Sequence, residues 1–197
     1  MYKRQLFLLP ISERVLGCKR INISVYDYQE TFVLGKGKIV GVYDNNTIGA
    51  VYNNYGRGKV FLFGSFVGYA YEKTGNVSRS LYRLFMTEPD PKIRSLIASP
   101  CQIANVSNPV TVSEPLVEAT LIESEKGIVI PLINYTTKEV DPKPIEITVT
   151  IKNPGKITSI ESIGEGGKEE KLKYKKVKDG IEVNLPLKVT KMIVIRH

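Results

Sequence analysis

The sequence contains only one histidine, His197, at position 197 of 197. Histidine is the usual general base of nucleophilic triads and the commonest metal ligand. We therefore do not expect a catalytic triad of the cysteine–histidine type. The sequence also has no Asp-rich loop of the kind that binds calcium. We expect neither a metal site nor a cofactor in this chain.

Cysteine is almost as scarce, because Cys18 and Cys101 are the only two and lack the Cys-x-x-Cys spacing of zinc or redox sites. A disulfide framework is not expected from two such distant thiols. Neither cysteine lies in a strand-to-helix elbow. We therefore predict that both are small apolar side chains buried in the core.

Long apolar runs are also missing, and none approaches the roughly 18 residues of a membrane-spanning helix. Residues 5–11, QLFLLPI, are too few for a signal peptide and lack a small-residue cleavage site. We expect no membrane association, and a soluble, cytoplasmic protein.

The net charge of +8 is concentrated in residues 1–95, which hold 14 Lys and Arg against 7 Asp and Glu. These basic residues occur singly or in pairs, without the interleaved aromatic residues of nucleic-acid-binding stripes. We expect no nucleic-acid partner. The densest charged run, residues 168–178, also contains Leu172, Tyr174 and Val177, which predicts a half-buried strand whose lysines face water.

The most informative stretch contains an apolar run, residues 60–63, between Gly58 and Gly64. Such a run predicts a strand buried on both faces. Gly56 and Gly58 fit the tight turn that joins it to the preceding strand. Together with the strand pattern before this turn, the run predicts an antiparallel meander over residues 38–63.

This stretch resembles the amidotransferase-like middle (trimerisation) domain of family forty-two beta-galactosidases. The likeness covers residues 32–84 and, by pattern, residues 117–197, because a small β-sandwich follows that domain in the family. It implies a subunit-contact domain, with the catalytic carboxylates on a barrel upstream. The residues that carry the likeness are Gly49, Ala50, Val51, Asn53, Tyr55, Gly56, Gly58, Lys59, Val60 and Gly64.

Residues 65–75 have the pattern of a loop, and a helix is predicted over residues 77–86 with Asn76 as its N-cap. Its apolar residues recur at helical spacing. The two prolines in TEPDPK, residues 87–92, then predict an exposed domain boundary. The apolar positions of this predicted helix are Val77, Leu81, Leu84 and Phe85.

Short segments of alternating polarity follow, separated by glycine and proline turns, as in a sandwich. The predicted fold class is α+β and mostly β: a partial α/β amidotransferase-like domain with an antiparallel meander and one helix, then an immunoglobulin-like β-sandwich. The predicted domains are residues 1–87 and 96–197, with a linker at 88–95. The expected sandwich strands are residues 117–123, 128–134, 145–151, 157–163, 171–177, 181–187 and 191–196.

No catalytic residue is predicted. A glycosidase needs two carboxylates that face each other, usually on barrel strands, and this length holds no barrel. An amidotransferase would have His-x-Glu after the strand that residues 60–64 resemble, where this sequence reads GSFVG. The acids considered lie in polar or turn contexts that explain them without catalysis: Glu13, Asp27, Glu30, Asp44, Glu72, Glu88 and Asp90.

Three aromatic residues, Phe66, Tyr69 and Tyr71, form the one candidate contact site for a sugar or a subunit. Aromatic rings after a sheet strand can stack on sugar rings, whereas the same spacing also suits rings packed beneath the following segment. Both interpretations stay open at this stage.

Two functions from different classes fit the sequence. In the first, the chain is a non-catalytic accessory region of a glycosidase-like protein that serves subunit assembly and supports an upstream catalytic barrel. Its partners would be that domain or other subunits of a homo-oligomer. In the second, it is a free-standing β-sandwich module that binds carbohydrate or protein. An in-frame barrel encoded upstream would favour the first.

Overall fold

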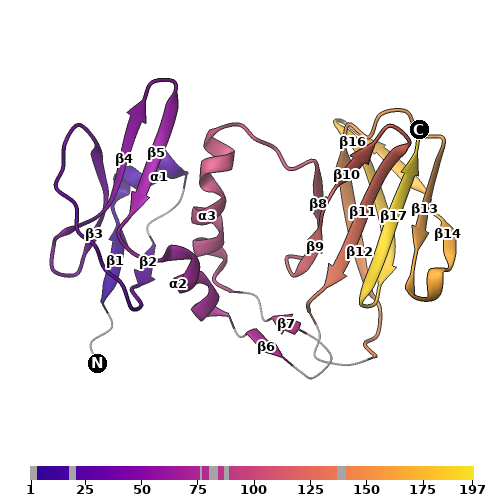
Figure 1. Ribbon diagram of the computed structural model, residues 1–197, viewed down its shortest axis with the longest axis horizontal. Coiled ribbons are helices and arrows are strands. Elements are labelled where there is room, and N and C mark those ends of the chain that lie inside the picture. Colours follow the sequence, from indigo (N-terminus) through magenta and orange to yellow (C-terminus); the bar gives the residue numbers. More distant parts are fainter. Residues whose placement is uncertain (1–3, 18–20, 76, 80–83, 87–88, 137–140) are drawn as a thin grey trace. The chain divides into compact units, whose positions relative to one another are not determined.

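The structure is a computed structural model that describes residues 4–17, 21–75, 77–79, 84–86, 89–136 and 141–197. The chain forms two compact units (Figure 1). The first comprises Met1–Asn76 and Pro89–Ser107, and the second comprises Val77–Glu88 and Asn108–His197. Within the described residues, no helix is long and apolar enough to cross a membrane.

The first unit contains a five-stranded antiparallel sheet with the strand order β2-β1-β3-β4-β5. The consecutive hairpins β3-β4-β5 confirm the meander that the sequence predicts over residues 38–63. The strands are β1 (Gln5–Leu8), β2 (Asn22–Ser24), β3 (Lys38–Tyr43), β4 (Ile48–Tyr55) and β5 (Gly58–Phe63).

The turns of the meander follow from local chemistry. Gly56 adopts a φ of 57° between β4 and β5, in the left-handed region that glycine enters without steric cost. Between β3 and β4, Asn46 has a φ of 60°. The side-chain oxygen of Asn45 accepts hydrogen bonds from the backbone N–H (3.2 Å) and the hydroxyl (2.7 Å) of Thr47.

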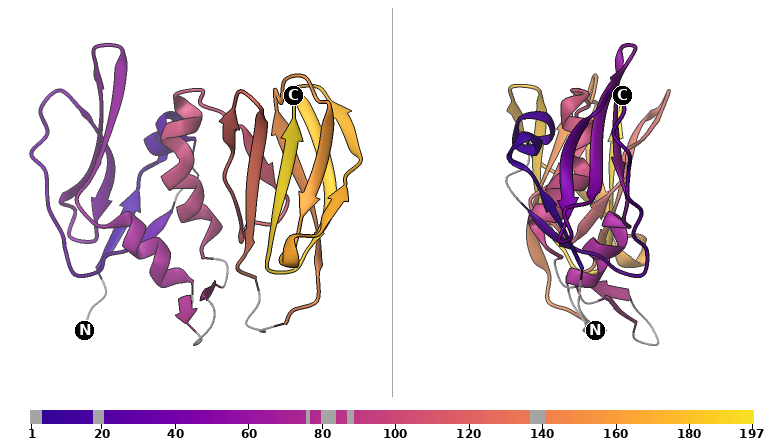
Figure 2. Two further views of the ribbon diagram at one scale, coloured as in Figure 1. Left: turned by 45° about the vertical axis from the view of Figure 1, so that its right-hand side comes forward. Right: turned by 90° about the vertical axis from the view of Figure 1, so that its left-hand side faces the viewer.

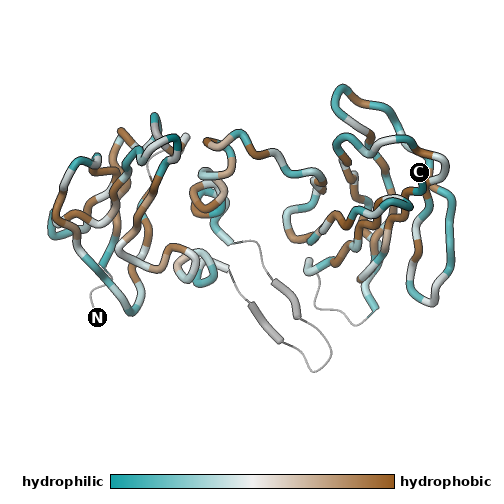
Figure 3. The backbone as a smooth tube through the Cα atoms, turned by 45° about the horizontal axis from the view of Figure 1, so that its top comes forward, coloured by the Kyte–Doolittle hydropathy of each residue, from teal (hydrophilic) through white to brown (hydrophobic). Residues whose placement is uncertain are grey.

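Three helices pack with this sheet: α1 (Pro10–Leu16), α2 (Val67–Thr74) and α3 (Pro91–Ile103). Their buried side chains include Leu16, Ala70, Ile93 and Leu96, which join the strand residues in one apolar core. Figure 3 shows how the apolar positions alternate along the strands. The helices thus supply the apolar cover that one face of the sheet needs.

Strand β5 differs from its prediction. It lies at the edge of the sheet and pairs only with β4 among the described residues. Val60 and Leu62 are 51% and 49% exposed, whereas Phe61 and Phe63 are half-buried against the core. The prediction of a strand buried on both faces is therefore wrong, because no element covers the Val60 side within the described part of the chain.

The segments around the predicted linker also differ. Residues 67–74, expected as a loop, form α2, and residues 77–79 and 84–86, expected as a helix, form the paired strands β6 (Val77–Arg79) and β7 (Leu84–Met86). The predicted N-cap Asn76 lies outside the described residues.

Helix α3 occupies the second half of the predicted linker, residues 88–95. Pro91 is tolerated at the first helical position, because a backbone N–H there would have no partner within the helix. The Asp90 side chain caps the helix by accepting a hydrogen bond from the backbone N–H of Lys92 at 2.8 Å. The second proline of TEPDPK, Pro91, is therefore the first residue of a helix. Cys101 lies on α3 and is exposed, so its predicted burial is wrong, while Cys18 lies outside the described residues.

The second unit is a β-sandwich with one core between two antiparallel sheets. One sheet has the order β10-β11-β17-β13-β14, with β9 also paired to β11, and the other has the order β15-β16-β12-β8. Its elements are β8 (Val110–Val112), β9 (Val117–Ala119), β10 (Ile122–Ser124), β11 (Gly127–Asn134), β12 (Ile145–Lys152), β13 (Ser159–Ile163), the 3-10 turn η1 (Glu165–Gly167), β14 (Glu169–Lys171), β15 (Tyr174–Val177), β16 (Gly180–Leu187) and β17 (Thr190–Arg196).

The sandwich core confirms the predicted mostly β fold class. On β16, Ile181, Val183 and Leu185 are all at most 3% exposed, as the period-2 alternation requires. Residues 117–123 and 171–177 are each divided between two short strands, and β8 adds a strand that the sequence pattern did not predict. Figure 2 shows these strands from two further directions.

Candidate functional site

The predicted sugar-contact residues lie at helix α2. Phe66 is the residue before its first turn and is 56% exposed. Tyr69 lies in the helix, half-buried, with the Lys73 ammonium 4.8 Å from its ring centre. Hydrogen bonding to the Tyr69 side chain raises the pKa of Lys73, because it favours the charged amine. Tyr71 packs against the core of the first unit, which is a structural role.

Two further tyrosines complete the group. The rings of Tyr28 and Phe66 stack with centroids 5.4 Å apart, and those of Tyr26 and Tyr69 meet edge to face at 5.8 Å. We call Tyr26, Tyr28, Phe66 and Tyr69 the aromatic cluster. Tyr28 is 47% exposed, so the Tyr28–Phe66 stack faces solvent. The sequence analysis missed Tyr26 and Tyr28, because the chain turns between them: Asp27 has a φ of 59° and Tyr28 N–H donates to the Tyr26 carbonyl at 2.6 Å.

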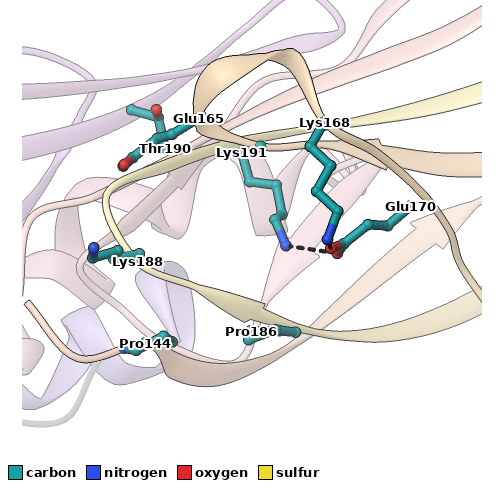
Figure 4. Close-up of a pocket in the computed structure, with 9 residues that line it drawn as sticks. Pro144, Glu165, Lys168, Glu170, Pro186, Lys188, Thr190 and Lys191 are labelled. Carbon is teal, nitrogen blue, oxygen red and sulfur yellow. Dashed lines mark ion pairs between the residues drawn. The ribbon is translucent and has the colours of Figure 1, made fainter.

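The sandwich contains a second candidate site, a cavity of about 210 Å³ that we call the sandwich pocket (Figure 4). Its walls come from the η1 turn, strand β14, the end of β16 and the start of β17. It is lined by Pro144, Gly164, Glu165, Lys168, Glu170, Pro186, Lys188, Thr190 and Lys191.

The loop that carries part of this lining is a closed turn. Gly164 N–H donates to the carbonyl of Lys168 at 3.2 Å, and Gly167 N–H donates to the carbonyl of Gly164 at 3.1 Å. Gly166 and Gly167 have φ values of 78° and 76°, which favour glycine at both positions. The glycines of the sequence thus fix Glu165 and Lys168 at the rim of the pocket.

Charged side chains meet inside the sandwich pocket. Lys168 Nζ lies 3.1 Å from Glu170 Oε1, and Lys191 Nζ lies 3.6 Å from Glu170 Oε2 (Figure 4). The hydrogen bond from Lys168 and the charges of both lysines hold the pKa of Glu170 below its usual value. Lys188 forms an ion pair with Asp141, which raises the pKa of Lys188.

Sequence reasoning did not find this pocket. It assigned residues 168–178 to a strand whose lysines face water, and Lys168, 78% exposed, follows that expectation. Lys191, however, comes from a different strand, and its side chain is only 14% exposed. Lys168 is two residues from Glu170, whereas Lys191 reaches the same carboxylate because β13 pairs with both β14 and β17, and no local pattern predicts that pairing.

Two solved structures contain regions that resemble the whole chain. One is alpha-L-fucosidase isoenzyme 2 from Paenibacillus thiaminolyticus, with a TM-score of 0.60 and 11% identity over 100% of this chain and 32% of that protein. The other is the beta-galactosidase from Bacillus circulans sp. alkalophilus, with a TM-score of 0.54 and 15% identity over 100% of this chain and 22% of that protein. This fold recurs within two glycosidases.

The likeness at these identities shows the fold alone. The chain spans about a third or less of each of these proteins. No protein-family model matches the sequence, and no curated protein matches it. The assignment to family forty-two and the amidotransferase-like character of the first unit therefore stay predictions.

Proposed function

We propose that this chain is a non-catalytic accessory region of a glycoside-hydrolase-like protein, where it serves subunit assembly and supports a catalytic domain. The observation that carries the proposal is how much of this chain is matched within larger glycosidases. The full length of the chain is matched within two glycosidases, of which it spans 32% and 22%. A region of that extent is large enough to act beside a catalytic domain in each of them.

An exposed apolar edge of the first unit supports the assembly role. We call Val33, Leu34, Val60 and Leu62 the apolar edge. They line one cavity along β5 and are 99%, 40%, 51% and 49% exposed. Exposed apolar side chains on an edge strand favour pairing with another chain, and contiguous patches of this kind mark interaction surfaces.

We expect the purified chain to self-associate through this edge. Introducing charge with Val60→Lys and Leu62→Lys together should convert the oligomer to a monomer, since two ammonium groups would have to be desolvated in the contact. Sedimentation equilibrium over a concentration series measures the result. Ile122→Lys is the matched control, because Ile122 is 55% exposed on a strand of the other unit. A wild-type chain that is monomeric throughout would contradict the assembly role.

The aromatic cluster favours a second candidate function, carbohydrate binding. Its outer pair, Tyr28 and Phe66, presents two stacked rings to solvent, and exposed aromatic faces can pack on the apolar faces of sugar rings. The hydroxyl of Tyr28 donates to Glu30 Oε2 at 3.3 Å, which places a carboxylate beside the rings as an acceptor for sugar hydroxyls.

If this cluster binds sugar, Phe66→Ala should weaken binding to a soluble polysaccharide by up to about tenfold, because the exposed stack is lost. Affinity electrophoresis against a panel of galactans and glucans measures retardation of the chain. Tyr55→Ala is the control, since Tyr55 is 80% exposed at the β4–β5 hairpin. Equal retardation of all three proteins would rule out the cluster as the contact.

A further inference from the structure

Lys191 is the most enclosed of the three lysines in the sandwich pocket. Its side chain is 14% exposed, against 38% for Lys188 and 78% for Lys168. Its aliphatic stem passes over Gly164, where an added Cβ would lie 3.5 Å from Lys191 Cε. The stem of Lys191 therefore lies within ordinary van der Waals contact of residue 164, which helps to enclose it.

The charge of Lys191 is incompletely neutralised. Its contact with Glu170 measures 3.6 Å, longer than the about 2.7–2.9 Å of a charge-assisted hydrogen bond. Glu170 also accepts the closer contact from Lys168, at 3.1 Å. Among the described residues, no other carboxylate lies within 4.0 Å of Lys191. An ammonium has three donors, and a partly buried one needs acceptors for them.

The carboxylate beside Lys191 is shared between two lysines. Lys168 and Lys191 both contact Glu170, whereas Lys188 is paired with Asp141 from outside the pocket lining. One carboxylate thus faces two ammonium groups, and Lys191 has the longer of the two contacts.

We propose that the sandwich pocket binds the carboxylate group of a small ligand, with Lys191 as the principal cation. A singly charged group matches the one ammonium charge that Glu170 leaves unmatched. The volume of about 210 Å³ lies below the about 300–1,000 Å³ of drug-sized sites, so the ligand is small. Pro144 and Pro186 offer apolar walls to its carbon atoms.

Two sources would supply this chemistry: an acidic sugar or a free small carboxylic acid. Backbone amide shifts of the full ¹⁵N-labelled chain, titrated at low salt, separate them. Galacturonate, galactose and acetate are the probes. We expect galacturonate to shift the amides of residues 164–170 and 188–191. Acetate binding at least tenfold weaker identifies a sugar acid, and equal binding identifies the carboxylate alone. Galactose binding as tightly as galacturonate, or no shift with any probe, overturns the proposal.

Two variants with opposite effects test the role of Lys191. Lys191→Gln should weaken galacturonate binding about tenfold, because the charged donor is lost. Glu170→Gln should strengthen it, because the internal carboxylate that competes for Lys191 is neutralised. A purely structural role of the cluster predicts no gain from Glu170→Gln. Lys175→Gln, at an exposed position on β15, is the control and should bind like the wild type. Unchanged affinity in both pocket variants overturns the proposal, even if Lys191→Gln alone perturbs folding.

Discussion

Gly64→Ala is expected to destabilise the first unit by about 3 kcal/mol or more, although it adds a single methyl group. A Cβ at this position would lie 2.0 Å from the carbonyl oxygen of Glu30 and 2.8 Å from the Tyr43 hydroxyl. The backbone cannot easily yield, because Glu30 N–H donates to the Gly64 carbonyl at 2.6 Å and Gly64 N–H donates to the Gly49 carbonyl at 2.9 Å. Relief of the clash must therefore break one of these hydrogen bonds.

Gly68→Ala is the matched control, with the opposite sign. Gly68 lies in α2, is exposed, and has no atom within 4 Å of an added Cβ. Alanine there should stabilise the helix by about 0.5–1 kcal/mol, since glycine has more backbone freedom to lose. Urea unfolding followed by amide signals of the first unit measures both changes. Equal stabilities of the two variants would mean that residues 30 and 64 are not in contact.

Leu185→Ala should cost the second unit about 2–5 kcal/mol. Leu185 is 1% exposed on β16 and belongs to the core that both sheets of the sandwich share. Removal of its side chain leaves a cavity that paired strands on either side cannot close, because their hydrogen bonds fix the backbone. The loss includes both the burial of the apolar side chain and its packing contacts.

Lys173→Ala is the comparison for Leu185→Ala. Lys173 is exposed between β14 and β15, and its truncation should change the free energy of unfolding by less than about 0.5 kcal/mol. Both variants should be followed by a probe within the second unit, since two units need not unfold together. Similar losses in both variants would contradict the placement of Leu185 in the core.

The sequence by itself determined the longer strands of the sandwich, β11, β12, β13, β16 and β17, but not β8 or the division of residues 117–123 and 171–177. Alternation at Ile181, Val183 and Leu185 is a local property, and the period of two puts these side chains on one face wherever the strand pairs. The same holds for the β3-β4-β5 meander, whose Asn and Gly turns have only short-range requirements. Composition also limited the candidate chemistry that the sequence suggests, because the sequence contains a single histidine, at position 197.

The tertiary structure decided what local patterns left ambiguous. The apolar run of β5 is compatible with a central or an edge strand, and only its place after β4 at the end of the sheet exposes Val60 and Leu62. A proline at position 91 is compatible with an exposed linker and with the first turn of a helix. The helix forms because it buries Ile93 and Leu96 in the core of the first unit. Local preference is weak here, and long-range packing overrides it.

The candidate sites show the same division. Tyr28 stacks on Phe66, and Lys191 reaches Glu170, through contacts between segments far apart in the sequence. The sequence around each of these side chains is that of an ordinary exposed or half-buried residue. The sequence determines the strand that carries Lys191 but not helix α2, which carries Tyr69. Only long-range pairing and packing decide which side chains share one surface, since those interactions act between distant parts of the chain.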